Sequence, residues 1–118
     1  MVYWITGRKN SGKTTLAYRL KAQIPNSVVL DGDEMRGVTD NQDYSHEGRL
    51  ANLLNIARLA CVFEEQGVVV IIACVSPNRG VRKELQKWFK ECIEICMPFG
   101  ELWKNTTYEE PEYGRKPR

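Results

Sequence analysis

Apolar and polar residues alternate along the chain in blocks, and the apolar blocks predict strands. Residues 2–6, 27–30 and 68–74 are short runs rich in β-branched side chains, with the length of buried strands. Residues 93–97 predict a last short strand. The run at 68–74 contains no polar residue, which is typical of a central parallel strand covered on both faces.

Between the strands, apolar residues recur at the three- and four-residue spacing of amphipathic helices. Pro25 is expected to end the first helix, and Ser45 to cap the start of the second. Residues 34–36 predict no more than one helical turn, followed by a polar loop at 37–44. The three predicted helices occupy residues 14–24, 45–66 and 81–92.

The first strand leads into a glycine-rich stretch. Residues 7–14 read G-R-K-N-S-G-K-T and match G-x-x-x-x-G-K-[ST], the phosphate-binding P-loop. Glycines at its two ends allow backbone conformations and close approaches that a Cβ would block. The lysine is expected to contact the β- and γ-phosphates, and the threonine hydroxyl to bind Mg²⁺. The predicted nucleotide-binding residues are Gly7, Asn10, Ser11, Gly12, Lys13, Thr14 and Thr15.

A phosphate-binding loop between a buried strand and a helix predicts an α/β protein with the P-loop NTPase fold. We expect three layers, α/β/α, around a small parallel sheet of about four strands. The length of 118 residues suits one domain, a single P-loop kinase domain over residues 1–118. Residues 98–118 show no sustained period and predict an irregular C-terminal tail, which Trp103 would pin to the body.

Composition narrows the classes of function. The net charge of +2 is spread along the chain, which argues against nucleic acid as a partner. No apolar run reaches membrane-spanning length and no secretory signal opens the chain, so we expect a cytoplasmic protein. The pair Cys92 and Cys96 has neither redox nor usual zinc spacing, so reduced thiols are expected. His46 is the only histidine, which excludes a multi-histidine metal site.

Two carboxylates indicate which kind of nucleotide protein this is. The sequence contains no N-K-x-D motif of GTPase switches, and the strand at 68–74 is not followed by the acidic residue of a Walker B motif. Asp31 and Asp33 instead follow the second strand, where open α/β sheets bind ligands. Asp33 is predicted to orient an acceptor hydroxyl, take its proton or hold Mg²⁺, as in a small-molecule kinase that uses ATP. A tight Asp-Gly turn is the alternative.

Three segments resemble those of adenylylsulfate kinases. Residues 30–36 read L-D-G-D-E-M-R and resemble the family's L-D-G-D-N-[LIV]-R. Residues 44–52 read Y-S-H-E-G-R-L-A-N and are similar to [FY]-S-x-E-D-R-x-E-N. Residues 76–79 read S-P-N-R and resemble S-P-[YF]-R. Order and spacing agree from residue 7 to about residue 82, so the chain looks like a member of this family.

The resemblance implies ATP-dependent phosphorylation of the 3′-hydroxyl of adenylylsulfate. It implies that Asp33 is the acid/base or Mg²⁺-organising carboxylate, supported by Asp31, and that Thr14 and Asp33 hold the metal. Simpler interpretations stay open for the substrate contacts named below: the arginines as solvated side chains, Tyr44 as surface packing, and Asn52 as part of the polar face of a helix. The implied catalytic residues are Lys13, Asp33, Asp31 and Ser76. Of these, Ser76 matches a serine that has been proposed to become phosphorylated in the family. The implied substrate contacts are Arg36, Tyr44, Arg49, Asn52 and Arg79.

The chain departs from the family in three places. Leu54 and Asn55 stand where the family has two arginines, and Asn78 stands where it has an aromatic residue. The family has a basic lid segment after its fourth strand, and this chain lacks it. Residues 101–111, which follow almost directly after the predicted last strand, resemble the family's closing segment T-G-x-x-x-P-Y-E-x-P. Two other functions therefore stay open: a kinase for another hydroxyl acceptor (nucleoside, sugar or polynucleotide end), or a non-catalytic nucleotide-binding module. The assembly, a homodimer included, is also open.

Overall fold

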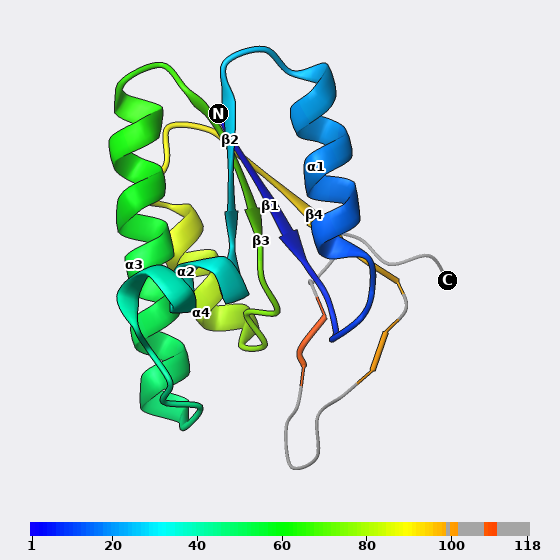
Figure 1. The fold of residues 1–118 in the computed structure, drawn as a ribbon, viewed down its shortest axis with the longest axis vertical. Helices are drawn as coiled ribbons and strands as arrows, with labels where there is room; N and C mark the ends of the chain where they lie inside the picture. Colours follow the sequence, from blue (N-terminus) through cyan, green and yellow to red (C-terminus); the bar gives the residue numbers. More distant parts are fainter. Residues whose placement is uncertain (99, 102–107, 111–118) are drawn as a thin grey trace.

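The computed structural model describes residues 1–98, 100–101 and 108–110. Trp103 and most of the predicted irregular tail lie outside the described residues, so the expected anchoring by Trp103 stays a prediction. The described residues form four strands and four helices (Figure 1). In chain order these are β1 (Val2–Thr6), α1 (Lys13–Gln23), β2 (Ser27–Asp31), α2 (Gly32–Thr39), α3 (His46–Glu65), β3 (Val69–Ala73), α4 (Arg79–Gln86) and β4 (Cys92–Cys96).

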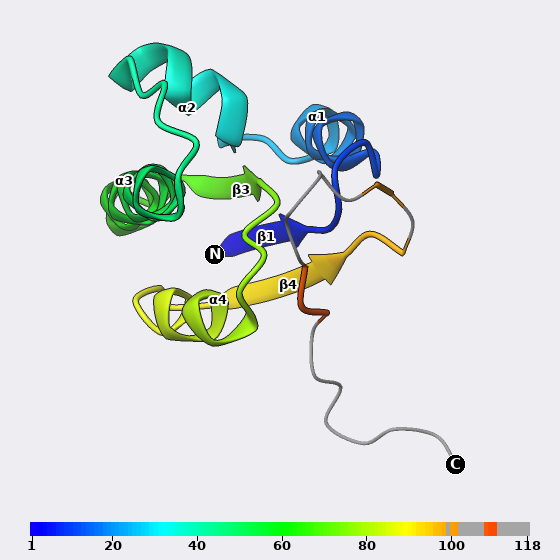
Figure 2. The same ribbon diagram turned by 90° about the horizontal axis from the view of Figure 1, so that it is seen from below.

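The four strands form one parallel sheet in the order β2-β3-β1-β4. β1 is central and pairs with β3 on one side and β4 on the other. α1 covers one face of the sheet, whereas α3 and α4 cover the other (Figure 2). The predicted three-layer P-loop fold with a four-stranded parallel sheet is therefore confirmed.

The core lies on both faces of the sheet. On the α1 face, Ala17 packs against Ile5 and Ile71. On the other face the larger cluster joins the strands to α2, α3 and α4, with the rings of Trp4 and Phe89 6.1 Å apart. The central strands β1 and β3 are largely buried on both faces, and this explains their continuous apolar runs in the sequence, whereas the edge strand β4 is partly exposed and contains Glu94.

Two predicted boundaries are wrong. Residues 32–39 form a full eight-residue helix, α2, instead of one turn, because Asp31 caps its start and Met35 is buried beneath it. The predicted helix over 81–92 ends at Gln86, and Cys92 belongs to β4. The chain turns between α4 and β4 where the carboxylate of Glu64 accepts hydrogen bonds from the backbone N–H groups of Lys90 and Glu91.

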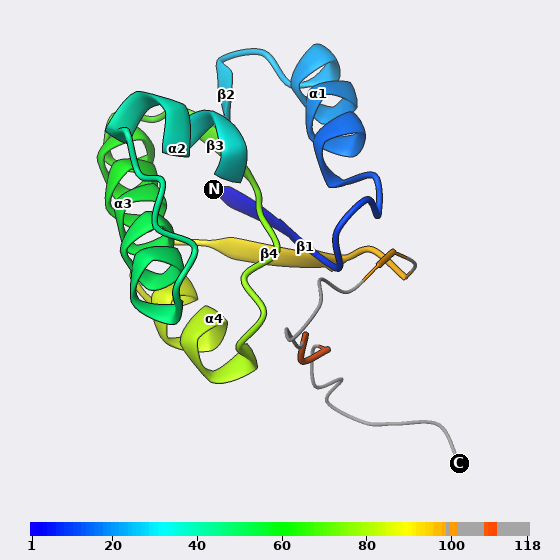
Figure 3. The same ribbon diagram turned by 60° about the horizontal axis from the view of Figure 1, so that its bottom comes forward.

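All four strands point their carboxyl ends to the same edge of the sheet, where the loops that follow them gather. Figure 3 shows the loop between β1 and α1 beside the chain that leaves β4. An antiparallel bridge between Lys9 and Glu101 joins these two segments. Over the described ranges, no helix has the combined length and apolar character needed to cross a bilayer.

Candidate active site

A cleft of about 980 Å³ lies at this edge of the sheet. The P-loop, the start of α2, the first half of α3 and the loop after β3 surround it, together with Glu101 and Glu109 of the tail. Of the site residues predicted from sequence, only Gly7 and Arg79 do not line it. Those that do are Asn10, Ser11, Gly12, Lys13, Thr14, Thr15, Asp31, Asp33, Arg36, Tyr44, Arg49, Asn52 and Ser76.

Backbone geometry explains both glycines of the P-loop. Gly12 precedes α1 with a φ of 92°, in the left-handed region that side chains disfavour. A Cβ at Gly7 would come within 3.0 Å of both the Cβ of Met97 and the Oγ of Ser11. Gly7 also has a positive φ, 152°, so an unusual backbone conformation explains both glycines, and a close approach applies at Gly7 as well.

Lys13 begins α1 and folds back over its own loop. Its Nζ donates to the carbonyl oxygen of Arg8 at 2.7 Å and to the Oγ of Ser11 at 3.4 Å. Burial lowers the pKa of the Lys13 ammonium, while the nearby charges of Asp31 and Asp33 oppose this shift. The ammonium is held in the cleft at the positive end of α1, where a polyphosphate would meet it.

Asp31 joins the P-loop to α2. One carboxylate oxygen accepts the Thr14 hydroxyl at 2.7 Å. The other accepts the N–H groups of Asp33 and Glu34, both at 3.1 Å, and so caps the helix. The side chain is buried, and each of its oxygens has a defined partner. Asp31 ends β2 and is the N-cap of α2, so the alternative of a tight Asp-Gly turn between strand and helix stays open beside a role in binding.

Asp33 lies on the first turn of α2, exposed and lining the cleft. Its position leaves the carboxylate accessible to a substrate hydroxyl. Oxygen donors from Thr14, Asp31 and Asp33 suit Mg²⁺, which takes one or two protein oxygens and keeps its other positions for water and phosphate. Among the described residues, no group of three or more acidic, histidine or cysteine side chains is arranged to hold a metal ion.

The α2–α3 connection builds one wall of the cleft around Arg36. Its Nη1 donates to the carbonyl oxygens of Asn41 and Asp43 and to the Asn41 side chain, at 3.0–3.2 Å. Its guanidinium carbon lies 4.1 Å from the ring centroid of Tyr44, a cation–π contact. Tyr44 stays 51% exposed and lines the cleft. Arg36 thus orders the loop that presents Tyr44.

Arg49 and Asn52 project from one face of α3, as their spacing predicted, and both line the cleft. The Nδ2 of Asn52 donates to the carbonyl oxygen of Gly32 at 3.2 Å, which ties α3 to the start of α2 beside Asp33. Asn52 is buried, and no described protein group bonds to its Oδ1. That oxygen is a remaining acceptor at the site.

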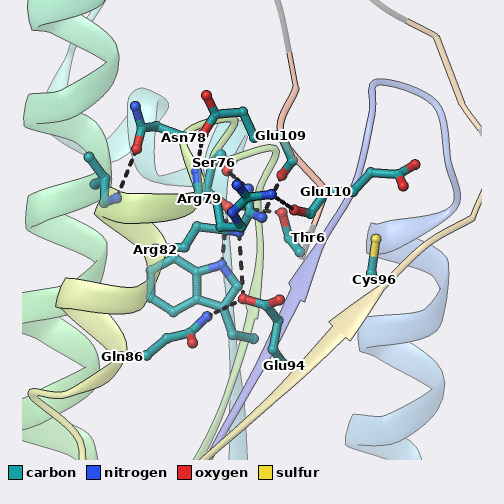
Figure 4. A network of polar contacts seen from close by, with 12 residues as sticks. Thr6, Ser76, Asn78, Arg79, Arg82, Gln86, Glu94, Cys96, Glu109 and Glu110 are labelled. Atoms are coloured by element: carbon teal, nitrogen blue, oxygen red, sulfur yellow. Dashed lines mark hydrogen bonds and ion pairs between the residues drawn. The ribbon is translucent and has the colours of Figure 1, made fainter. Parts of the chain in front are cut away.

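Ser76 and Arg79 occupy different places from those expected of groups that contact a substrate (Figure 4). Ser76 is buried with a φ of 41°, and its Oγ accepts from Trp4 Nε1 at 3.1 Å and lies 3.2 Å from the Thr6 hydroxyl. Arg79 faces the tail, where its Nη1 donates to the carbonyl oxygen of Glu110 at 3.0 Å. A catalytic role for Ser76 and a substrate contact for Arg79 remain sequence predictions.

Cys74 forms part of the cleft floor directly after β3. It is buried beneath α2, and a Cβ at Gly32 would lie 3.3 Å from the Cys74 Cβ. Burial raises the pKa of its thiol to about 11, so it stays protonated at neutral pH. All four cysteines are free, in agreement with the expectation of reduced thiols.

Sequence reasoning missed the acidic residues of the tail. Glu101 accepts a hydrogen bond from the Asn10 side chain at 3.2 Å, and Glu109 accepts one from the backbone N–H of Arg79 at 2.9 Å. The signal for Glu109 was the resemblance of residues 101–111 to the family's closing segment. Nothing in the sequence pattern indicated Glu101.

A family model described as adenylylsulphate kinase matches residues 1–114 of the chain. Cytidine diphosphoramidate kinase of Campylobacter jejuni is 33% identical over 104 residues, which cover 81% of this chain and 61% of that protein. Adenylyl-sulfate kinase of Paraburkholderia xenovorans is 40% identical over 87 residues, which cover 70% of this chain and 49% of that protein.

A solved structure of the Mycobacterium tuberculosis APS kinase, in complex with AMPPNP and APS, superposes with a TM-score of 0.69 at 27% identity. The match covers 81% of this chain and 61% of that one. This chain spans about half the length of the curated relatives that it matches, from 44% to 61%.

Proposed function

Because the chain belongs to the adenylylsulphate kinase family, we propose that it transfers the γ-phosphoryl group of ATP to the 3′-hydroxyl of adenylylsulfate. The observation that carries the proposal is that the P-loop and the residues predicted to contact the acceptor line one cleft. The P-loop lies on one side, and Tyr44, Arg49 and Asn52 lie on the other. Asp33 lies between them at the start of α2.

The P-loop is proposed to hold the donor. Its backbone N–H groups and the N-terminus of α1 face the phosphates of ATP, and Lys13 exchanges its bond to the Arg8 carbonyl for phosphate oxygens. Bound Mg²⁺ would neutralise charge on the β- and γ-phosphates, with the Thr14 hydroxyl and Asp33 as protein oxygens near it. Asp31 fixes the Thr14 hydroxyl in place.

On the acceptor side, Asp33 is proposed to orient the hydroxyl and receive its proton. The Tyr44 ring, which lines the cleft, would stack on the base, and Arg49 would bind the anionic end with its guanidinium fork. Arg36 acts by ordering the Tyr44 loop. The remaining acceptor oxygen of Asn52 suits a substrate hydroxyl or N–H. We extend the proposal to a cytoplasmic role in sulfate activation.

A second candidate is transfer to another nucleotide-linked hydroxyl acceptor. Two observations favour it: a relative at 33% identity is named cytidine diphosphoramidate kinase, and Asn78 lines the cleft where adenylylsulfate kinases have an aromatic residue. The Oδ1 of Asn78 caps α4 through the Val81 N–H at 2.9 Å. The cleft therefore carries an amide in place of a ring, which changes what base it can bind.

Product analysis tests the proposal. The protein is incubated with ATP, Mg²⁺ and either adenylylsulfate or cytidine diphosphoramidate, and the products are identified by ³¹P NMR with ADP release followed in parallel. We expect ADP and 3′-phosphorylated adenylylsulfate in equal amounts. Turnover of the cytidine compound alone would replace the leading function by the second candidate. ATP binding without turnover on either acceptor would favour a non-catalytic module.

A further inference from the structure

Residues 108–110, here called the tail strap, lie across the carboxyl ends of β1, β3 and β4. The Tyr108 hydroxyl lies 3.1 Å from the Thr6 hydroxyl and 3.5 Å from the Cys96 Sγ. Glu109 donates its backbone N–H to the Pro77 carbonyl at 2.7 Å. These contacts connect the strap to three strand ends that are far apart in the sequence, and they place Glu109 in the lining of the cleft.

One side chain connects the strap to the loop after β3. Arg82 of α4 is completely buried, and its Nη1 donates to the Ser76 carbonyl at 2.7 Å (Figure 4). Its Nη2 donates to the Glu109 carbonyl at 2.5 Å, and its guanidinium carbon lies 5.0 Å from the Tyr108 ring centroid. The carboxylate of Glu94 lies 3.5 Å from Nε and balances the charge, without hydrogen-bond geometry.

A buried, charged side chain that costs free energy to desolvate is retained where its hydrogen bonds fix a particular arrangement. Here two Arg82 nitrogens bind two backbone carbonyls, those of Ser76 and Glu109, and neither carbonyl belongs to a helix or strand. The loop residue Ser76 has a left-handed φ of 41°, which a serine adopts only when its surroundings hold it there.

We propose that Arg82 is a positioning residue that couples the tail strap to the Ser76 backbone and so shapes the cleft wall that contacts the acceptor. The proposal rests on the proposed function for the identity of that acceptor. The wall consists of the 76–78 loop, Val81 and Glu109, facing α3 across the cleft. The tail also binds the P-loop through the Lys9–Glu101 bridge, so one segment of chain contacts both halves of the site.

The test compares Arg82→Lys, which keeps the charge and loses the planar fork, with Tyr108→Ala, which removes the strap's ring without entering the core. Lys87→Ala, at the exposed C-cap position just after α4, is the matched control. We expect both test variants to raise the KM for the acceptor by about tenfold, with the KM for ATP unchanged. Arg82→Lys loses a charge-assisted bond, and Tyr108→Ala loses the ring contact with Arg82 and the hydroxyl contacts with Thr6 and Cys96. Hydrogen–deuterium exchange should quicken over residues 75–79 and 108–110 together.

Equal rises in the two KM values would overturn the proposal, because they would indicate general loosening. Unchanged exchange at residues 75–79 in Tyr108→Ala would also overturn it, whether or not Arg82→Lys folds. If the wild type phosphorylates no acceptor, the proposed function fails, and the exchange measurement alone still decides whether the strap and the loop are coupled. Faster exchange at both segments, with the P-loop unaffected, would support the coupling.

Discussion

The proposed donor and acceptor halves of the cleft are held in different ways. In the donor half, the functional side chains bond directly to one another or to their own loop, as in Lys13 to Arg8 and Thr14 to Asp31. In the acceptor half, Arg36 bonds mainly to the backbone of the loop that carries Tyr44. The donor half is therefore organised by its own motif, whereas the acceptor half depends on how a neighbouring loop folds.

This difference separates what is general from what is specific. A polyphosphate is common to every P-loop protein, so a short local motif suffices to bind it. The acceptor is expected to differ between family members. The loop that carries Tyr44 is held by Arg36, so a few substitutions there are enough to change its shape. Substitutions in the donor half should therefore affect the rate, and those in the acceptor half should affect substrate binding.

The largest effect is expected from Lys13→Ala. Removal of the ammonium takes away the charge that meets the transferring phosphoryl group, so kcat should fall by about 10²–10³-fold. Circular dichroism should show an unchanged fold, since Lys13 is only half-buried. Near-normal kcat would mean that the P-loop lysine does not act on the phosphates here.

Asp33→Asn should lower kcat by about 10²–10⁴-fold, the range of general base catalysis, without loss of stability, because the side chain is exposed. The matched variant Asp31→Ala removes the cap of α2 and should lower the free energy of unfolding by about 0.5–2 kcal/mol. Full activity of Asp33→Asn would rule out Asp33 as the catalytic carboxylate. It would also remove the residue on which the division into donor and acceptor halves depends.

Arg36→Ala should act on the acceptor half alone. Loss of its bonds to the Asn41 and Asp43 carbonyls frees the Tyr44 loop, so the KM for the acceptor should rise about tenfold. The KM for ATP should not change, and steady-state kinetics with each substrate varied in turn separates the two. Val38→Ala, an exposed position on the same helix, is the control. A parallel rise for ATP would show that the two halves are not independent.

The smallest effect on activity is expected at the opposite edge of the sheet. The Glu64 carboxylate is buried, which alone would raise its pKa, but its bonds to the Met1 ammonium and to the N–H groups of Lys90 and Glu91 outweigh this and lower the pKa below its ordinary 4.5. Its contribution to stability is therefore present above about pH 4.5 and lost as the pH falls through the lowered pKa.

Glu64→Gln should consequently reduce the free energy of unfolding by about 1–3 kcal/mol at neutral pH and flatten its decline in acid. Urea titrations at a series of pH values measure both. The KM values for both substrates should stay at the wild-type level, since Glu64 lies far from the cleft. An altered KM would mean that the two edges of the sheet communicate.

Local patterns gave the strands, the P-loop and the start of α3 from sequence, because each has a short signature: an apolar run, a spaced motif or a capping serine. The length of α2 could not be predicted, since Gly37, Val38 and Thr39 are poor helix formers and burial of Met35 decides the matter. The end of α4 depended on a carboxylate 26 residues away in sequence.

The same reasoning explains what was missed in the site. Lys13, Thr14 and Asp31 come together through contacts close to their motifs. The burial of Ser76 and the role of Arg82 depend on Trp4 and Tyr108, which lie more than twenty residues away in sequence. Contacts of that kind leave no periodic signal in a single sequence.

The buried Cys74 thiol has a consequence for how the protein's motions can be followed. A protonated thiol is a poor nucleophile, and Cys74 lies beneath α2 at the centre of the cleft floor. We therefore expect alkylation of Cys74 to be slow while α2 stays packed on the end of β3. The second-order rate of that labelling reports the population of opened molecules, and a bound nucleotide should slow it. Cys74 is therefore a native reporter residue for the opening of the site.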